Sequence, residues 1–326
     1  MRPDHVGYRR SGMTIVTIAV SLIALPCFAQ TYPAKPIRIV TAEPGGGNDF
    51  TARTIGQAIG GRLGQPWVVD NRGGAGGLIA AEIVARAPAD GYTLLVYAGN
   101  IWTIPLLQPN VRYDPLRDFA PISWAARSPN TLVVHPSLLV KSVQELIALA
   151  RAKPGALSYG SGGTGASTHF AAELFKSMTR TDILRVTYRG NGPALTDLVA
   201  GNIQVMFSPT GAATPHVKSG RVRAIAVTSI EPTPLAPGLP TIASAGLPGY
   251  ESIQIYGVYA PAKTAEAIVR RLNEAVVAVV GVSEVRERFL NSGMEPVGST
   301  PAELASAMKT DMARLARLVK EAGIRE

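Results

Sequence analysis

Three glycine-rich segments in this 326-residue chain each stand between an apolar run and a helical pattern. The first set is an expected strand at 37–41, a loop at 43–47 and a helix at 49–63. The second is a strand at 67–69, a loop at 71–77 and a helix at 78–87. The third is a strand at 157–161, a loop at 160–165 and a helix at 167–178. Buried apolar strands separated by helices of this length are typical of a parallel sheet with helices on both faces. The sequence therefore predicts an α/β fold, with loops of similar kind at the ends of several strands.

The alternation of strands and helices starts again after Asp118, which indicates a second α/β unit. Further strands are expected at 93–98, 131–135, 185–188, 203–208 and 223–228, and further helices at 142–153 and 193–200. The first of these helices begins at an expected cap, Ser142, with Glu145 three residues later. A proline-rich stretch, 231–250, reads as a loop. The chain ends in helical patterns over 264–280, 283–292 and 300–322, and the last two begin with expected capping residues, Ser283 and Thr300. We expect two lobes, 31–128 plus 252–326 and 129–251, with crossovers near 125–130 and 250.

The N-terminus has the pattern of a secretory signal peptide. Basic residues precede a 13-residue apolar run, 13–25, and small residues at Cys27 and Ala29 follow it. This run is shorter than the roughly 20 residues that span a bilayer, so an anchor is the weaker alternative. Cleavage after Ala29 would remove residues 1–29 and with them the one cysteine. The mature chain would then contain no disulfide and no cysteine-bound metal.

Charge argues against nucleic acid as a partner. Loss of the leader removes three arginines and one aspartate, which lowers the formal net charge from +9 to +7. The remaining cations are scattered, whereas a nucleic-acid-binding protein usually gathers them in a patch. A diffuse positive field favours small anions.

Because each glycine-rich segment opens a helix, it can present unpaired N–H groups and a partial positive charge to an anion. Ligands of open parallel sheets gather at the carboxyl ends of the strands, so these segments could share one cleft. Each could also be an ordinary tight turn, with Asp49 and Ser167 as helix caps and Arg189 as a solvated cation. The candidate ligand-binding residues are Gly45, Gly46, Gly47, Asn48, Asp49, Ser161, Gly163, Thr164, Gly165, Ala166, Ser167, Arg189, Gly190 and Asp197.

Enzyme motifs are weak. Residues 160–165 satisfy G-x-G-x-x-G by letter, but no acidic residue follows at a strand end about 20 residues later. The histidines lack metal-ligand spacing, and neither Ser161 nor Ser167 sits in a complete G-x-S-x-G elbow. We expect no catalytic residue, no metal and no cofactor.

The chain resembles the substrate-binding receptors of tripartite tricarboxylate transporters, also called the Bug family. The resemblance is carried in order by the segments 33–38, 44–49, 69–77, 89–94, 114–119, 188–198, 239–243 and 246–250. It implies a two-lobed, periplasmic-binding-protein-like fold of type II-like topology, each lobe a mainly parallel sheet flanked by helices, with a central cleft. It also implies a periplasmic, monomeric receptor that captures a small carboxylate by lobe closure and delivers it to a membrane transporter. Some relatives act in sensing, which remains the alternative, with an exported enzyme as the weaker one.

Glu43 departs from the family pattern, because many relatives have an aromatic residue and a proline just before the first loop, where this chain has residues 41–44. A carboxylate beside an anion site could point away or could receive an amino group. The ligand therefore stays open among carboxylates, amino acids and amides.

Overall fold

A computed structural model describes residue 1, residues 32–108 and residues 110–324. All but the first residue of the predicted signal peptide, and its cleavage site, lie outside this range. The chain divides into a unit 1–31 and a compact unit 32–326, and the second unit is described below. In the described part of the chain, no helix combines the length and apolar character needed to cross a bilayer.

The N-terminal strands form one side of a ten-stranded sheet. β1 (Ile37–Thr41) lies between β2 (Trp67–Asn71) and β3 (Thr93–Ala98) and runs parallel to both. Ile39 is level with Val69 on one neighbour and with Leu94 on the other. β3 then pairs antiparallel with β9 (Ile253–Pro261), so a strand from near the C-terminus completes this side.

The other side of the sheet is built from the middle of the chain. β5 (Ser158–Ser161) is parallel to β6 (Leu184–Thr187) and β7 (Val205–Pro209). β7 and β8 (Arg223–Val227) each pair antiparallel with β4 (Phe119–Val134). The predicted parallel strands are therefore present, but strands that run antiparallel to their neighbours join them.

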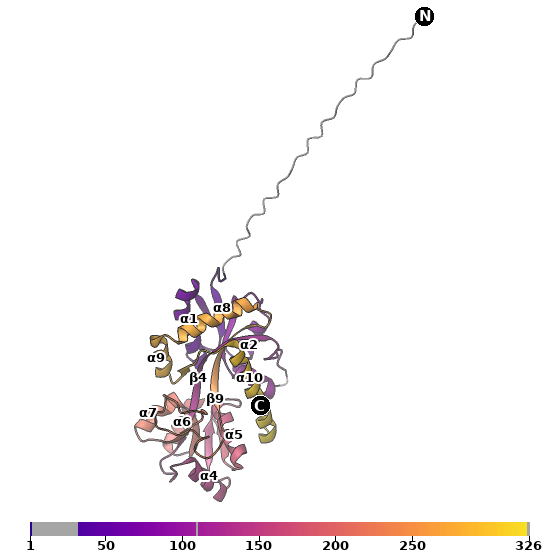
Figure 1. The fold of residues 1–326 in the computed structure, drawn as a ribbon. Helices are drawn as coiled ribbons and strands as arrows, with labels where there is room; N and C mark the ends of the chain where they lie inside the picture. Colours follow the sequence, from indigo (N-terminus) through magenta and orange to yellow (C-terminus); the bar gives the residue numbers. More distant parts are fainter. Residues whose placement is uncertain (2–31, 109, 325–326) are drawn as a thin grey trace. The chain divides into compact units, whose positions relative to one another are not determined.

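β4 and β9 lie side by side and connect the two sides (Figure 1). β4 pairs with β9 from Phe119 to Pro129 and with β7 from Asn130 onward. The sequence predicted a crossover at 125–130 and a strand only at 131–135, and the part of β4 that was not predicted contains two prolines, Pro121 and Pro129. The strand instead runs through this region, with register shifts after Pro121 and Trp124. The expected lobe boundaries remain a prediction.

Helices cover both faces of the sheet. They are α1 (Gly47–Leu63), α2 (Leu78–Ala85), α3 (Asn100–Leu107), α4 (Val143–Ala152), α5 (Ser167–Thr179), α6 (Asn191–Ala200), α7 (Thr210–Lys218), α8 (Glu266–Val280), α9 (Ser283–Asn291) and α10 (Pro301–Ala322). A 3₁₀ turn (Ala75–Gly77) precedes α2, and a short strand β10 (Glu295–Pro296) pairs with β4. One core cluster joins α1 and α8 to the first strands, and another joins α4 and α5 to β5 and β7.

Local signals explain most helix ends. Ser142 caps α4 by accepting the N–H of Glu145, as predicted. Thr300 and Glu303 form a reciprocal capping box at the start of α10. Val282, not Ser283, is the cap residue of α9, so the cap expected there was wrong. α3 and α7 were not predicted, since each contains a proline, Pro105 and Pro215.

Candidate functional site

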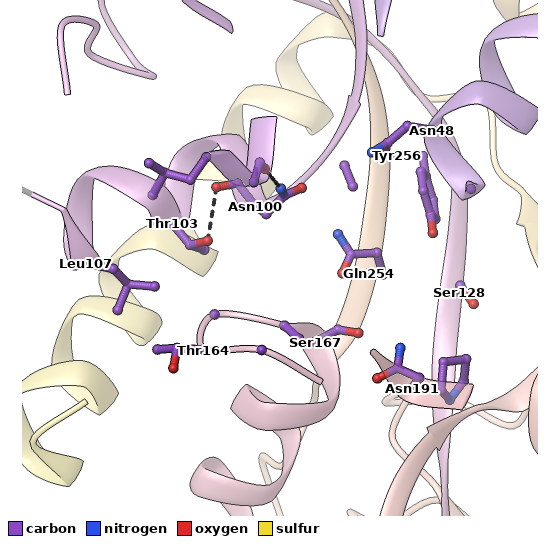
Figure 2. Close-up of a pocket in the computed structure, with 18 of the residues that line it drawn as sticks. Asn48, Asn100, Thr103, Leu107, Ser128, Thr164, Ser167, Asn191, Gln254 and Tyr256 are labelled. Atoms are coloured by element: carbon purple, nitrogen blue, oxygen red, sulfur yellow. Dashed lines mark hydrogen bonds between the residues drawn. The ribbon is translucent and has the colours of Figure 1, made fainter. Parts of the chain in front are cut away.

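A cavity of about 400 Å³ lies where the two sides of the sheet meet (Figure 2). Its wall is formed by glycine-rich loops, by the first turns of helices and by the long strands β4 and β9. The lining residues are Gly47, Asn48, Gly76, Ala98, Asn100, Thr103, Ile104, Leu107, Gln108, Ser128, Asn130, Gly163, Thr164, Gly165, Ala166, Ser167, Asn191, Pro209, Gln254 and Tyr256.

Five helices begin at this cavity. Gly47, Asn100, Ser167 and Asn191 are the first residues of α1, α3, α5 and α6, and Pro209 is the cap residue of α7. Within the described chain, no side chain caps any of these five helices. Because the first-turn N–H groups of a helix have no partner inside the helix, uncapped starts leave donors and a partial positive charge facing the cavity.

The described lining contains no charged side chain. Its polar groups are carboxamides and hydroxyls, together with the backbone of the glycine-rich segments. Burial raises the pKa of Tyr256 to about 12, so its hydroxyl stays neutral at ordinary pH. An anion in this cavity would therefore be held by N–H and O–H donors and by helix starts, a recognised way of binding phosphates and carboxylates.

Gly47 leaves room for Tyr256 at the first loop. A methyl group on Gly47 would lie 2.5 Å from the Tyr256 hydroxyl oxygen and 2.9 Å from Cε of Met294. Tyr256 comes from β9, so this close approach joins the start of α1 to a strand from the far end of the chain. A side chain at position 47 would displace a residue of the cavity wall.

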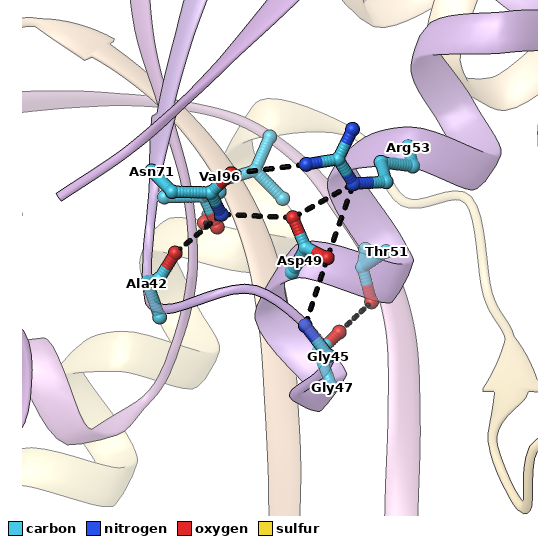
Figure 3. Close-up of polar contacts among 9 residues, drawn as sticks. Ala42, Gly45, Gly47, Asp49, Thr51, Arg53, Asn71 and Val96 are labelled. Atoms are coloured by element: carbon cyan, nitrogen blue, oxygen red, sulfur yellow. Dashed lines mark hydrogen bonds and ion pairs between the residues drawn. The ribbon is translucent and has the colours of Figure 1, made fainter. Parts of the chain in front are cut away.

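Asp49 organises the first loop from behind the cavity (Figure 3). Its Oδ2 accepts the N–H of Gly45 at 3.0 Å, and its Oδ1 accepts from Arg53 Nε at 2.9 Å and from Asn71 Nδ2 at 2.8 Å. Asn71 also donates to the carbonyl of Ala42 at 2.6 Å, which ties the ends of β1 and β2 to α1. Burial alone would raise the pKa of Asp49, but the hydrogen bonds from Arg53, Asn71 and Gly45 lower it. Asp49 therefore remains ionised as a structural anchor.

Glu43 contacts the second glycine-rich loop and does not line the cavity. Its Oε1 accepts the N–H of Gly74 at 2.6 Å, and its side chain fills the space that a methyl group on Gly73 would need. The residue that sets this chain apart from its family pattern thus joins two loops. The reason to expect an amino group on the ligand disappears with this contact.

Arg185, on β6, holds the third glycine-rich loop. Its guanidinium donates to Ser161 Oγ at 3.1 Å, to the carbonyl of Gly162 at 3.3 Å and to Thr164 Oγ1 at 3.5 Å. Ser161 is fully buried behind the loop and does not line the cavity. Arg185 therefore places positive charge behind the loop while the lining itself stays neutral.

His169 supports the same loop as a hydrogen-bond acceptor. Its Nδ1 faces the N–H of Gly165 at 3.3 Å, which requires this nitrogen to be unprotonated. Burial, with a further contribution from Arg185, lowers the pKa of His169 to about 4. Thr168 beside it donates to Asn191 Oδ1 at 3.0 Å and so connects the starts of α5 and α6.

The structure brings half of the predicted site residues to the cavity. Those in its lining are Gly47, Asn48, Gly163, Thr164, Gly165, Ala166 and Ser167. Ser167 is the first residue of α5 and not its cap, which is Ala166. The predicted residues that lie elsewhere are Gly45, Gly46, Asp49, Ser161, Arg189, Gly190 and Asp197.

Arg189, Gly190 and Asp197 lie outside the lining of the cavity. Arg189 is exposed at the turn after β6. Gly190 is the cap residue of α6, with φ 147°. Asp197 accepts from the Tyr188 hydroxyl at 2.7 Å and from Asn202 Nδ2 at 3.2 Å, so its carboxylate serves the packing of α6.

Sequence reasoning missed the part of the wall that comes from α3, β4 and β9. Asn100, Thr103 and Leu107 belong to a helix that contains Pro105, and Gln254 and Tyr256 belong to a strand in the stretch 251–263, for which no element was predicted. A signal for β9 was present, because residues 253–260 alternate between two faces and place Gln254 and Tyr256 on the same one.

Among the described residues, no group of three or more His, Cys, Asp or Glu side chains is arranged to hold a metal ion. The geometry suits reversible binding through hydrogen bonds.

The model of the tripartite tricarboxylate transporter family receptor matches residues 51–324 of the chain. The chain belongs to this receptor family. It is 35% identical over 314 residues to Protein BugT of Bordetella pertussis, an alignment that covers 94% of this chain and 95% of BugT.

Solved structures agree with this membership. An R. palustris protein with adipate is 38% identical, with a TM-score of 0.76 and coverage of 90% of this chain and 99% of that one. A structure described as a periplasmic transporter is 36% identical, with a TM-score of 0.75 and the same coverage. The receptor therefore has the α/β periplasmic-binding-protein-like fold that was predicted, and it belongs to a family of periplasmic solute-binding proteins and not of enzymes.

Proposed function

We propose that this receptor captures a small carboxylate in the cavity at the starts of α1, α3, α5, α6 and α7 and delivers it to a membrane transporter. The observation that carries the proposal is the combination of five uncapped helix starts with a lining that has no charged side chain among the described residues. Helix starts favour a negative charge without the flexibility of a lysine or arginine.

The ligand contacts are proposed as well. Gly47, Asn48 and the segment 163–167 offer backbone N–H groups, while Ser167, Thr164 and Asn191 offer side-chain donors. Gly45, Gly46, Asp49, Ser161 and Gly190 would act by shaping these loops. The bound adipate of the R. palustris relative supports a carboxylate as the ligand class.

Export and closure complete the proposal. The signal peptide at 1–29 would direct the chain to the periplasm and be removed after Ala29. Closure of the lobes 31–128 plus 252–326 and 129–251 around the cavity would then distinguish the loaded receptor from the empty one. We propose that the receptor acts as a monomer.

A thermal-shift screen tests carboxylate capture. Hexanoate, adipate and hexanamide share a six-carbon chain and carry one, two and no carboxylate groups, respectively. A ligand at 100 times its Kd stabilises the folded state by about 2.7 kcal/mol, which raises the Tm by roughly 5 °C for a chain of this size. We expect adipate or hexanoate to produce such a rise and hexanamide to produce none. If none of a wider set of carboxylates shifts the transition, the receptor does not capture this class of solute.

A further inference from the structure

A second hollow lies on the surface between α5 and α10, away from the ligand cavity. Its volume is about 740 Å³, against about 400 Å³ for the cavity. α5 contributes Leu174, Ser177 and Met178, and α10 contributes Lys309, Arg317 and Leu318. We call this feature the α5–α10 groove.

The groove is apolar at its base, and its rim carries the cations Lys309, Arg314 and Arg317 and one carboxylate, Glu321, so that its net charge is positive. Leu318 is buried, and Leu174 and Met178 are half-buried. Lys309 and Arg317 are exposed, and neither forms an ion pair with another described residue within 4.0 Å. Two unpaired cations beside an apolar base are complementary to a segment with acidic and apolar side chains.

The groove and the ligand cavity share a helix and a core cluster. Ser167, at the start of α5, lines the cavity, and Met178, near its end, lines the groove. Leu107 of the cavity wall packs against a cluster that contains Phe170, Leu315 and Leu318. A partner seated in the groove would therefore contact the same helix whose first turn borders the ligand.

Contacts across the groove come from parts of the chain far apart in sequence. Ser177 donates to Glu321 at 3.3 Å, and Arg314 donates to the carbonyl of Glu251. A partner that touches both walls would respond to any change in the position of α10 relative to α5. A transporter receptor needs such a surface, because its loaded form must be distinguished from its empty form.

We propose that the α5–α10 groove is the docking surface for an acidic, partly apolar loop of the membrane transporter. This inference rests on the proposed function only for the existence of a transporter partner. It does not depend on which solute fills the cavity.

Site-specific photocrosslinking in cells that make the receptor together with its transporter tests the docking surface. A benzophenone amino acid replaces Ala313, an exposed residue of the groove, or Ala316, an exposed residue of α10 outside it. We expect an adduct with an integral membrane component of the transporter, identified by mass spectrometry, from position 313 and at least fivefold less from position 316. Absence of that adduct, or equal yields from the two positions, would overturn the proposal.

Charge reversal tests the chemistry of the partner with the same readout. Arg317→Glu should reduce the adduct from position 313 at least fivefold, whereas Lys320→Glu, an equal change on the same helix outside the groove, should leave it within twofold. Equal effects of the two variants would show that an acidic loop is not the occupant. The thermal-shift screen reports separately on solute capture, so failure of docking and failure of the proposed function remain distinguishable.

Discussion

Gly47 illustrates how a single residue shapes the cavity. Its position at the start of α1 has no special backbone conformation, so an alanine would normally favour the helix by about 1 kcal/mol. The obstacle is the Tyr256 hydroxyl, which a methyl group would approach to 2.5 Å. A substitution here therefore acts on the cavity wall and not on helix propensity.

We expect Gly47→Ala to weaken ligand binding about tenfold, equivalent to about 1.4 kcal/mol, because Tyr256 must move. Gly61→Ala is the matched control: Gly61 lies in the same helix, and a methyl group there would meet no other atom within 4 Å. It should raise the free energy of unfolding by about 0.5–1 kcal/mol and leave affinity unchanged. Calorimetric titration and denaturant unfolding of both variants provide the measurement, and equal affinities would refute the assigned role of Gly47.

His169 makes stability depend on pH. Burial lowers its pKa in the folded protein from the ordinary 6.5 to about 4, so between these values the unfolded chain binds more protons than the folded one. The free energy of unfolding should therefore fall as pH drops from about 6.5 to about 4, by up to about 3 kcal/mol from this residue. His169→Gln, whose side-chain oxygen can still accept the N–H of Gly165, should have a shallower dependence. Parallel pH profiles from urea unfolding would contradict a buried neutral histidine.

At the scale of elements, helix starts divide into two kinds. α10 begins with a complete capping box, whereas α5 begins at the cavity with no side-chain cap in the described chain. Capping satisfies N–H groups that a ligand would otherwise use. Thr300 therefore stabilises its own helix by capping it, whereas Ala166 leaves the first N–H groups of α5 available to a ligand.

Ser167→Ala and Thr300→Ala should separate these uses. Loss of the Thr300 cap should lower the free energy of unfolding by about 1 kcal/mol and leave ligand affinity unchanged. Loss of the Ser167 hydroxyl, which caps nothing, should change stability by less than about 0.5 kcal/mol and weaken binding about fivefold. If Ser167→Ala destabilises as much as Thr300→Ala and binds normally, its hydroxyl belongs to the helix and not to the site.

Elements with a strong local pattern were predictable from the sequence. β1, α4, α5 and α10 have clear apolar periodicity, flanking glycines or caps, and their positions were found to within a few residues. The glycine-rich loops were correctly placed between strand and helix, which brought half of the predicted site residues to the cavity.

The remaining elements depend on contacts that a sequence pattern does not contain. β4 and β9 gain their stability by pairing with each other across more than one hundred residues of chain, and prolines in β4 obscured its continuity. The partners of Asp49, Glu43 and Arg185 come from other strands and loops, so their structural roles could not be distinguished from ligand contacts. Gln254 and Tyr256, the wall residues that were missed, lie on β9, so their positions also depend on this long-range strand pairing.

At the scale of the whole molecule, the cavity combines a positive electrostatic environment with an uncharged lining. Arg185 lies behind the third loop, and five helices begin around the space. Since Tyr256 titrates near pH 12 and no carboxylate, lysine or arginine lines the described cavity, the protein side of binding should not titrate between about pH 6.5 and 9. Affinity for a carboxylate should stay constant over this range.

Calorimetric titration with adipate and with adipamide, at pH 7 and pH 9, shows whether the cavity selects its ligand by negative charge. The two molecules have the same chain length, but only adipate carries the negative charge that uncapped helix starts favour. Adipate should bind at least 100-fold more tightly than adipamide, with a Kd that changes less than twofold between the two pH values. Equal affinity for the two molecules, or no measurable binding of adipate or any other carboxylate, would contradict this expectation.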